Sequence, residues 1–343
     1  MPPSSDLLSL DEIDLFAGMG GAALGLREAG FRCRIAVERD PAAVQSLARS
    51  GLSVLPFDVD ASGQALASAL HRALSDLPSV LRLGLLWASP PCQPFSMAGG
   101  RRAADDPRNR WPATLAVIDA LRPQVFVGEN VGSFARHDRD CTPLNIESCS
   151  GCVFDVVVAA VAARFPYAGV WTLDAAAVGV PQHRTRVFVW GSERPLPDPI
   201  LTHGPGRSTP YVTLRDVLGA TLLSPTRAHY PLDGSAGRAG TEPGRLDRPS
   251  PTVMTTEVKG TRASEASGWT FHGGPDRASD ATFLACGVRR ITLDEALKLQ
   301  GFPPDVRPAG TVEQGYTQVG NAVPPPLAAA IGRAIRAGWG AVV

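Results

Sequence analysis

Short apolar runs alternate with helix-patterned segments throughout the first 190 residues of the chain. The apolar runs, which we predict to be strands, cover residues 13–17, 34–38, 83–88, 125–128 and 187–190. The segments with helical patterning cover residues 22–29, 42–49, 64–77, 114–121 and 153–164. The run at 83–88 is apolar without interruption, which is typical of a strand covered on both faces. This alternation predicts an α/β fold with a doubly wound, mostly parallel sheet.

The composition changes after Gly191. Residues 191–250 are rich in Pro, Gly, Ser, Thr and Arg, and an apolar stretch interrupts them at 211–223. Helical patterning returns at 292–300 and at 326–337. We therefore predict a main domain over residues 1–190, completed by residues 305–343, and a small irregular domain over residues 191–304.

The overall composition excludes several classes of protein. Of the 343 residues, 44% are hydrophobic and 19% charged, as in a folded globular protein. No apolar run reaches the ~18 residues that span a bilayer, and the N-terminus lacks the pattern of a secretory signal. We expect a cytoplasmic protein with no membrane partner. The 33 basic and 33 acidic residues balance, which argues against non-specific coating of nucleic acid but allows one basic cleft.

A glycine-rich turn follows the first predicted strand. Gly18, Gly20 and Gly21 begin a G-x-G-x-x-A pattern, in which the backbone can approach a ligand at a helix N-terminus. Glu38 ends the second strand, where a carboxylate can accept hydrogen bonds from ribose hydroxyls. Asp58 would lie on the next loop, near an adenine amino group. This half-site fits NAD, FAD or S-adenosylmethionine, and the alternatives are a tight turn and, for Asp58, a helix cap.

A cysteine lies in a proline-rich loop directly after the strand at 83–88. Residues 89–96 read Ser-Pro-Pro-Cys-Gln-Pro-Phe-Ser, and three prolines exclude helix from this segment. The loop presents Cys92 at the carboxyl edge of the sheet, where open α/β folds bind ligands. Because a free structural cysteine prefers apolar packing, this position indicates a nucleophile.

These segments resemble the DNA (cytosine-5) methyltransferases. PPCQPFS is similar to the nucleophile loop of that family, and DLFAGMGG to its methyl-donor loop. Further similar segments follow in the family's order: Glu129-Asn130-Val131, the QHRTR of 182–186, Arg248 with the PTV of 251–253, residues 291–304, and the GNAVPP of 320–325. Together they cover nearly the whole chain and imply an S-adenosylmethionine-dependent, Rossmann-like catalytic domain with a small target-recognition domain.

The resemblance implies a covalent mechanism. Cys92 would add to C6 of the target cytosine, because C5 is too weak a nucleophile to accept a methyl group unaided. Glu129 would donate a proton to N3 and accept from the N4 amino group. Arg186 would point to the base O2, and Arg184 would support the site or bind a phosphate. From the residues alone, two alternative interpretations remain. Glu129 forms a salt bridge at a strand end, and Arg184 and Arg186 lie at a solvated strand end.

The resemblance also implies a binding site for S-adenosyl-L-methionine. Its expected contacts are Phe16, Gly18, Gly20, Gly21, Glu38, Arg39, Asp58, Val59, Pro90, Asn321 and Ala322. Arg39 departs from the family pattern, because many relatives have an aromatic or bulky apolar residue there to pack on adenine. Phe16 and Val59, or the guanidinium plane of Arg39, would supply that packing here.

Double-stranded DNA is the expected partner, with the target base rotated out of the stack. The expected DNA contacts are Gln93, Ser96, Arg101, Arg102, Arg248 and Thr252. Residues 93–106 resemble the family's mobile active-site loop, with Arg108 nearby. Base readout would come from the arginines of 191–248 and from loops near 255–262. Solvated loop charge is the alternative for each arginine taken singly.

Four potential metal ligands occur in an apparent insertion after the Glu129 segment. They are His137, Cys141, Cys149 and Cys152, with one C-x-x-C pair. These side chains are of the kinds that bind zinc, but a single pair can equally pack against the sheet. We expect no metal and keep zinc as the alternative.

The sequence thus predicts a monomeric enzyme that methylates cytosine C5 in duplex DNA. By analogy alone, it acts beside a cognate restriction endonuclease or as an orphan. One rival is a tRNA cytosine-5 methyltransferase on the same scaffold, but the CFT-like segment usual in those relatives is absent. A catalytically idle DNA-binding regulator would not need Cys92, Glu129 and Arg186 together. A Rossmann dehydrogenase would explain the glycines and Glu38 but not PPCQPFS.

Overall fold

The computed structural model describes residues 7–59, 62–74, 83–92, 106, 108–135, 152–219, 248–250, 252–253 and 291–340. These residues contain a sheet of seven strands in the order β3-β2-β1-β4-β5-β7-β6. The strands are β1 (Asp11–Leu15), β2 (Arg32–Glu38), β3 (Val54–Pro56), β4 (Leu85–Ala88), β5 (Val125–Val131), β6 (Tyr167–Asp174) and β7 (Thr185–Ser192). Strands β1 to β5 are parallel to one another, whereas β7 runs antiparallel to both β5 and β6. The predicted doubly wound, mostly parallel sheet is therefore confirmed.

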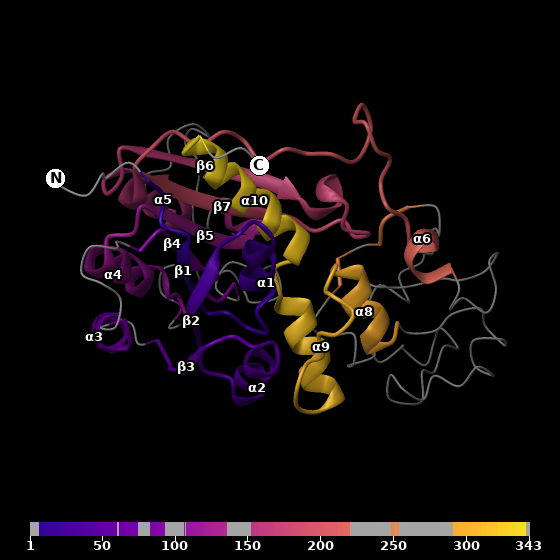
Figure 1. Cartoon of the computed structure of the whole chain (residues 1–343), viewed down its shortest axis with the longest axis horizontal. Coiled ribbons are helices and arrows are strands. Elements are labelled where there is room, and N and C mark those ends of the chain that lie inside the picture. Colours follow the sequence, from indigo (N-terminus) through magenta and orange to yellow (C-terminus); the bar gives the residue numbers. More distant parts are fainter. Residues whose placement is uncertain are drawn as a thin grey trace.

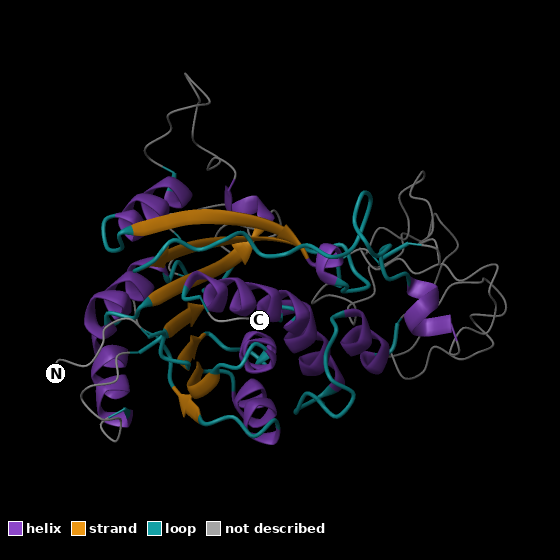
Figure 2. Cartoon of the chain, turned by 45° about the horizontal axis from the view of Figure 1, so that its top comes forward, coloured by secondary structure: helices purple, strands orange, loops and turns teal. Residues whose placement is uncertain are grey.

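Helices cover both faces of this sheet (Figure 2). The helices of the described residues are α1 (Gly21–Glu28), α2 (Pro41–Arg49), α3 (Gln64–Ala73), α4 (Trp111–Leu121), α5 (Val153–Ala162), α6 (Leu214–Leu218), α8 (Leu293–Leu299), α9 (Val312–Asn321) and α10 (Pro325–Gly338), with short 3-10 turns at Gly132–Ala135 and Ala175–Val178. α3, α4 and α5 pack on the face that carries Ile13 and Leu15 of β1. α1 and α10 pack on the opposite face, against Leu85 and Trp87 of β4.

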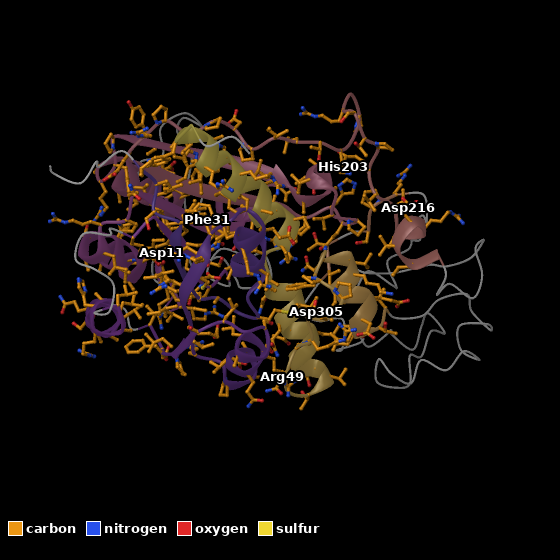
Figure 3. The ribbon with its side chains drawn as sticks, viewed as in Figure 1. Asp11, Phe31, Arg49, His203, Asp216 and Asp305 are labelled. Carbon is orange, nitrogen blue, oxygen red and sulfur yellow. The ribbon has the colours of Figure 1, made fainter. Side chains whose placement is uncertain are left out.

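A third apolar cluster joins the sheet domain to the later part of the chain. Met19 and Leu24, at the start of α1, pack with residues of α6, α8 and α9. Figure 1 shows these three helices to the right of the sheet, and Figure 3 shows His203 and Asp216 on the same side. The start of α1 therefore lies where the two parts of the chain meet. The division at residues 190 and 304 remains a prediction.

Four helices and strands of the structure were not predicted: β3, β6, α6 and α9. β3 has three residues and α6 five, β6 is an edge strand in which only Trp171 and Leu173 are buried, and the Val312–Asn321 segment is largely polar. β1 ends at Leu15 rather than residue 17, since Phe16 has a φ of 59° and leaves the extended conformation. Among the described residues, no helix has the length and apolar character needed to cross a membrane.

Candidate active site

The turn between β1 and α1 has an unusual backbone. Phe16, Gly18 and Gly20 have φ values of 59°, 56° and 89°, in the left-handed region that favours glycine. A Cβ on Gly18 would meet no atom of the described residues within 4 Å, so among them open space lies beside this residue. A Cβ on Gly21, in contrast, would lie 2.1 Å from the carbonyl oxygen of Val323. Gly18 therefore borders a space that a ligand can fill, whereas Gly21 allows close packing against the chain's closing segment.

Glu38 fixes this turn from the end of β2. Its Oε2 accepts a hydrogen bond from the Gly18 amide at 2.8 Å, and its Oε1 accepts from the amides of Arg39 and Asp40, each at 2.8 Å. A carboxylate offers about four acceptor sites, so Oε2 retains one. Glu38 can hold the glycine turn and still accept one hydrogen bond from a ligand hydroxyl.

The predicted adenine contacts lie beyond Glu38. Arg39 Nη1 lies 3.2 Å from Asp58 Oδ1, and both side chains are largely exposed. Val59 is buried, and Phe16 packs against the same apolar cluster. Because Asp58 already binds the guanidinium of Arg39, the arrangement favours Phe16 and Val59 over Arg39 as the apolar surface for an adenine.

The predicted catalytic side chains come together at the ends of three strands. Glu129 lies on β5, Arg186 on the neighbouring β7, and Cys92 four residues after the end of β4. Arg186 Nε lies 3.0 Å from Glu129 Oε1, with both side chains about 10% exposed. Burial and the Glu129 carboxyl raise the pKa of the Cys92 thiol, while Arg186 and Arg184 oppose that rise. The half-buried Cys92 thiol therefore lies close enough to the buried Glu129 carboxyl group and Arg186 guanidinium to interact with their charges.

The surroundings of Glu129 favour the protonated form of its carboxyl group. Burial raises the pKa of its carboxyl group, and the charges of Arg186 and Arg184 and a hydrogen bond from Ser89 limit the rise. A buried carboxyl group with a raised pKa can act as a proton donor near neutral pH. This environment agrees with the role that the sequence resemblance implies for Glu129.

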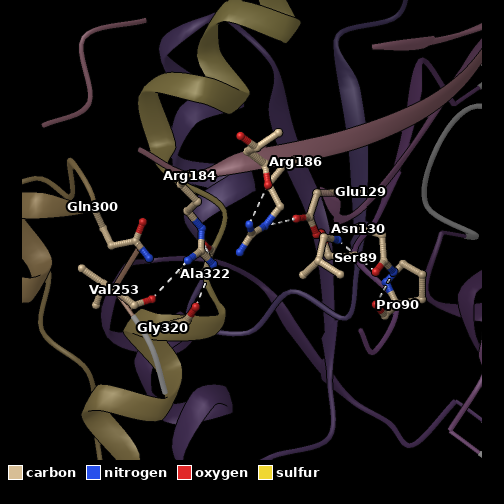
Figure 4. A network of polar contacts seen from close by, with 12 residues as sticks. Ser89, Pro90, Glu129, Asn130, Arg184, Arg186, Val253, Gln300, Gly320 and Ala322 are labelled. Carbon is tan, nitrogen blue, oxygen red and sulfur yellow. Dashed lines mark hydrogen bonds and ion pairs between the residues drawn. The ribbon is translucent and has the colours of Figure 1, made fainter. Parts of the chain in front are cut away.

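The loop that carries Cys92 is tied to β5 through Asn130. The Asn130 amide donates to the carbonyl oxygen of Pro90 at 3.2 Å, and its own oxygen accepts from the Val131 amide at 3.0 Å (Figure 4). Pro90 was predicted to contact the cofactor, and it is buried with its carbonyl bound in this way. Asn130 was not predicted as a site residue, although its place directly after Glu129 could have suggested it.

Arg184 is a buried link between chain segments. Its guanidinium donates to the carbonyl oxygens of Val253 at 3.3 Å, Gly320 at 2.7 Å and Ala322 at 3.0 Å, and the residue is 1% exposed. Burial and the neighbouring Arg186 lower its pKa. This position favours the supporting role predicted for Arg184 and leaves no exposed surface for a phosphate. Ala322, whose carbonyl oxygen binds Arg184, is buried, whereas Asn321 is exposed at the end of α9.

Two buried glutamines extend this link. Gln182 accepts from the Val253 amide at 2.7 Å and donates to Gln300 Oε1 at 3.1 Å. Gln300 in turn donates to the Val319 carbonyl oxygen at 2.6 Å. The hydrogen bonds connect the segment just before β7 with the segment around Val253 and with α8 and α9. Sequence reasoning did not assign these glutamines, because a polar side chain gives no sign of burial on its own.

The predicted DNA contacts are only partly described. Arg248 is exposed, and its carbonyl oxygen accepts from the Leu214 amide at 2.9 Å. Thr252 donates its hydroxyl to the His183 carbonyl oxygen at 2.8 Å, so its side chain serves the internal structure. Arg108 forms two hydrogen bonds with the Asp106 carboxylate, at 2.8 and 2.6 Å. Gln93, Ser96, Arg101 and Arg102 lie outside the described residues.

The zinc alternative rests mainly on residues that the structure does not describe. His137, Cys141 and Cys149 lie outside the described residues, and Cys152 is buried just before α5. Within the described ranges, no group of three or more His, Cys, Asp or Glu side chains is arranged to hold a metal ion.

Comparisons with known proteins agree with this arrangement. The sequence profile of the C-5 cytosine-specific DNA methylase family matches residues 10–222 and 248–337. Type II methyltransferase M.XorII from Xanthomonas oryzae pv. oryzae is 29% identical over 93% of this chain and 83% of its own. M.NgoMIV from Neisseria gonorrhoeae, also a Type II methyltransferase, is 26% identical over 96% of this chain and 97% of its own.

Solved structures share the fold at lower identity. A DNMT2 variant from Spodoptera frugiperda has a TM-score of 0.61 at 17% identity, over 96% of this chain and 100% of its own. The Entamoeba histolytica methyltransferase EhMeth has a TM-score of 0.59 at 16% identity, over 95% and 97%. The fold is therefore that of these methyltransferases. The matched profile covers both the sheet and the closing helices, and the chain belongs to the C-5 cytosine-specific DNA methylase family.

Proposed function

We propose that this protein transfers a methyl group from S-adenosyl-L-methionine to C5 of cytosine in duplex DNA. The observation that carries the proposal is the buried ion pair of Glu129 and Arg186 with the half-buried Cys92 thiol near enough to interact with both charges. These three groups can attack C6, protonate N3 and contact O2 of one pyrimidine ring. The Type II methyltransferases among its relatives support a role in a restriction-modification system.

The chain's own residues perform the proton and bond changes. Cys92 loses its proton to solvent water, and its sulfur forms a bond to C6 while N3 takes the proton of Glu129. The resulting electron-rich C5 accepts the methyl group. The proton on C5 then leaves to a base, N3 returns its proton to Glu129, and the bond between Cys92 and C6 breaks. Arg186 stabilises the charge on the Glu129 carboxylate after its proton has moved to the ring.

The described residues fit the proposed cofactor. The open space beside Gly18 and the remaining acceptor site of Glu38 suit a ligand with ribose hydroxyls. Phe16 and Val59 would pack against its adenine, with Asp58 near the amino group. When bound, S-adenosyl-L-methionine supplies a methyl group on a sulfonium, which makes that methyl electrophilic.

The substrate, the location and the partners are part of the same proposal. A tRNA substrate on this scaffold would be expected with a CFT-like segment, which the sequence lacks. We propose a cytoplasmic, monomeric enzyme in which residues 191–304 read the DNA sequence. Within the described part of residues 191–304, Arg207, Arg215 and Arg248 are exposed and suited to phosphate or base contact.

Methylation of a plasmid tests the proposal. The chain and its Cys92→Ala variant are expressed in a bacterial host without cytosine methylation, and the recovered plasmids are sequenced after bisulfite treatment. We expect 5-methylcytosine at one short recurrent sequence with the wild type and none with the variant. An unmethylated plasmid from a folded, expressed wild-type protein, together with methylated host tRNA, would contradict the DNA assignment.

A further inference from the structure

A hydrogen-bond relay leads from the sheet to Glu129. The indole nitrogen of Trp87 lies 3.1 Å from Ser89 Oγ. Ser89 directly follows Ala88 of β4, which pairs with Gly128 of β5, so Ser89 and Glu129 lie beside each other and the Ser89 hydroxyl is within reach of the Glu129 carboxyl group. An indole N–H can only donate, whereas a hydroxyl has one donor and two acceptor sites. The Ser89 oxygen therefore accepts from Trp87 and keeps its single proton for Glu129. Chemistry fixes the direction of the first hydrogen bond, and the second runs from Ser89 to Glu129 whenever the carboxyl group is ionised.

Both members of the relay are rigidly held. Trp87 is 0% exposed on β4, and its ring packs edge-to-face against Phe188 with ring centroids 5.9 Å apart. The Ser89 amide donates to the Leu15 carbonyl oxygen at 3.0 Å, which fixes the backbone where β4 ends. The Phe188 contact holds the indole in place, and rotation of the Ser89 hydroxyl would break its hydrogen bond with Trp87.

Other charged and titratable groups act on Glu129 from each neighbouring element. Arg186 and Arg184 lie on the β7 side, the Cys92 thiol lies on the loop after β4, and Asp14 acts from β1. Arg186 occupies Oε1 of the carboxyl group at 3.0 Å. Ser89 is a second donor to the same carboxyl group. The two donors together limit the positions at which the carboxyl group can carry its own proton.

We propose that Ser89, oriented by Trp87, is a positioning residue that directs the acidic proton of Glu129 toward N3 of the target base. The inference rests on the proposed function, because it assumes that Glu129 protonates a pyrimidine. Neither donor touches the base. Ser89 acts through Glu129, first by limiting the orientations of the carboxyl group and then by stabilising the carboxylate after the proton has left.

The test measures methylation by Ser89→Ala, Ser89→Thr and Trp87→Phe across a range of pH. Loss of a hydrogen bond to a charged group predicts a drop in kcat of about ten-fold or more for Ser89→Ala. Removal of this donor also raises the pKa of Glu129, so the limb of the kcat/KM profile that reports loss of its proton moves to higher pH. Ser89→Thr keeps the hydroxyl and should restore both properties.

Two control variants match the chemistry of these changes. Ser192→Ala removes another buried serine hydroxyl, and Trp190→Phe removes an indole N–H that has no partner in the described part of the chain. Both should retain wild-type activity. Trp87→Phe should shift the profile in the same direction as Ser89→Ala by a smaller amount, and the double variant should resemble Ser89→Ala, because both changes act through one hydroxyl.

The outcomes separate this inference from the proposed function. An inactive wild-type protein refutes the function itself. An active wild type with an unchanged kcat and pH profile in Ser89→Ala overturns the inference alone. Equal losses in Ser89→Thr and Ser89→Ala, or additive losses from Trp87→Phe and Ser89→Ala, also overturn it, since the relay requires the hydroxyl and requires both residues to act together.

Discussion

Replacement of Glu12 by glutamine should make the stability of the protein less dependent on pH. Glu12 is 0% exposed at the centre of the sheet, where it pairs with Cys33 on β2 and Leu85 on β4. Among the described residues, no nitrogen or oxygen donor reaches its carboxylate oxygens. Burial raises the pKa of Glu12 from its ordinary 4.5 to about 8, with a small opposing effect of the Cys33 thiol.

The direction in which stability changes with pH follows from the protonation of Glu12 in the folded and in the unfolded chain. Below pH 4.5 the carboxyl group is protonated in both the folded and the unfolded chain, and ionisation does not oppose folding. Between about pH 4.5 and 8 the unfolded chain loses this proton while the folded chain keeps it, so stability falls as the pH rises. Each pH unit in this window removes at most ~1.4 kcal/mol, which amounts to about 5 kcal/mol at the upper end.

Urea unfolding at pH 5 and at pH 8 measures this effect. We expect Glu12→Gln to match the wild type within about 1 kcal/mol at pH 5 and to exceed it by about 2–5 kcal/mol at pH 8. Glu28→Gln, at an exposed position on α1, should follow the wild type at both values. The reasoning is refuted if the wild type and Glu12→Gln lose stability in parallel between the two pH values.

Three further predictions concern the site. Arg184→Met should lower the free energy of unfolding by about 3–5 kcal/mol, measured by denaturant titration, because it leaves the carbonyl groups of Val253, Gly320 and Ala322 without their buried donor; a change below about 1 kcal/mol would contradict the linking role. Asn130→Ala should lower kcat about ten-fold in a methylation assay with little change in unfolding temperature, because it frees the Pro90 carbonyl from β5, and an unchanged kcat would argue against that role. Metal analysis of the purified protein should find no stoichiometric zinc, and one zinc per chain would restore the cysteine alternative.

The sequence predicted the parts of the fold that have strong local signals. The apolar run at 83–88 and the glycine turn at Gly18–Gly21 predicted β4 and the start of α1, because both depend on residue type over short spans. The edge strand β6 was not predicted, since only Trp171 and Leu173 are buried in it and its formation depends on pairing with β7. The antiparallel direction of β7 likewise depends on its place between β5 and β6.

The candidate site shows the same limit. Cys92, Glu129 and Arg186 were found through motifs, and the structure brings them together. The buried amide pair Gln182 and Gln300 joins segments 118 positions apart in the chain, and no local pattern marks such a contact. Ser89 lay inside the predicted nucleophile loop, but its role depends on Trp87 and on the neighbouring strand.

Trapping of the covalent intermediate tests the central claim most directly. Duplex DNA that carries 5-fluorocytosine at the methylated position is incubated with the protein and S-adenosyl-L-methionine, and the product is analysed by peptide mass spectrometry. Fluorine at C5 cannot leave as a proton does, so the bond between sulfur and C6 persists. We predict one stable adduct on the peptide that contains Cys92. Full methylation of ordinary DNA without an adduct on the fluorinated DNA, or an adduct on another cysteine, would contradict the assignment of Cys92 as the nucleophile.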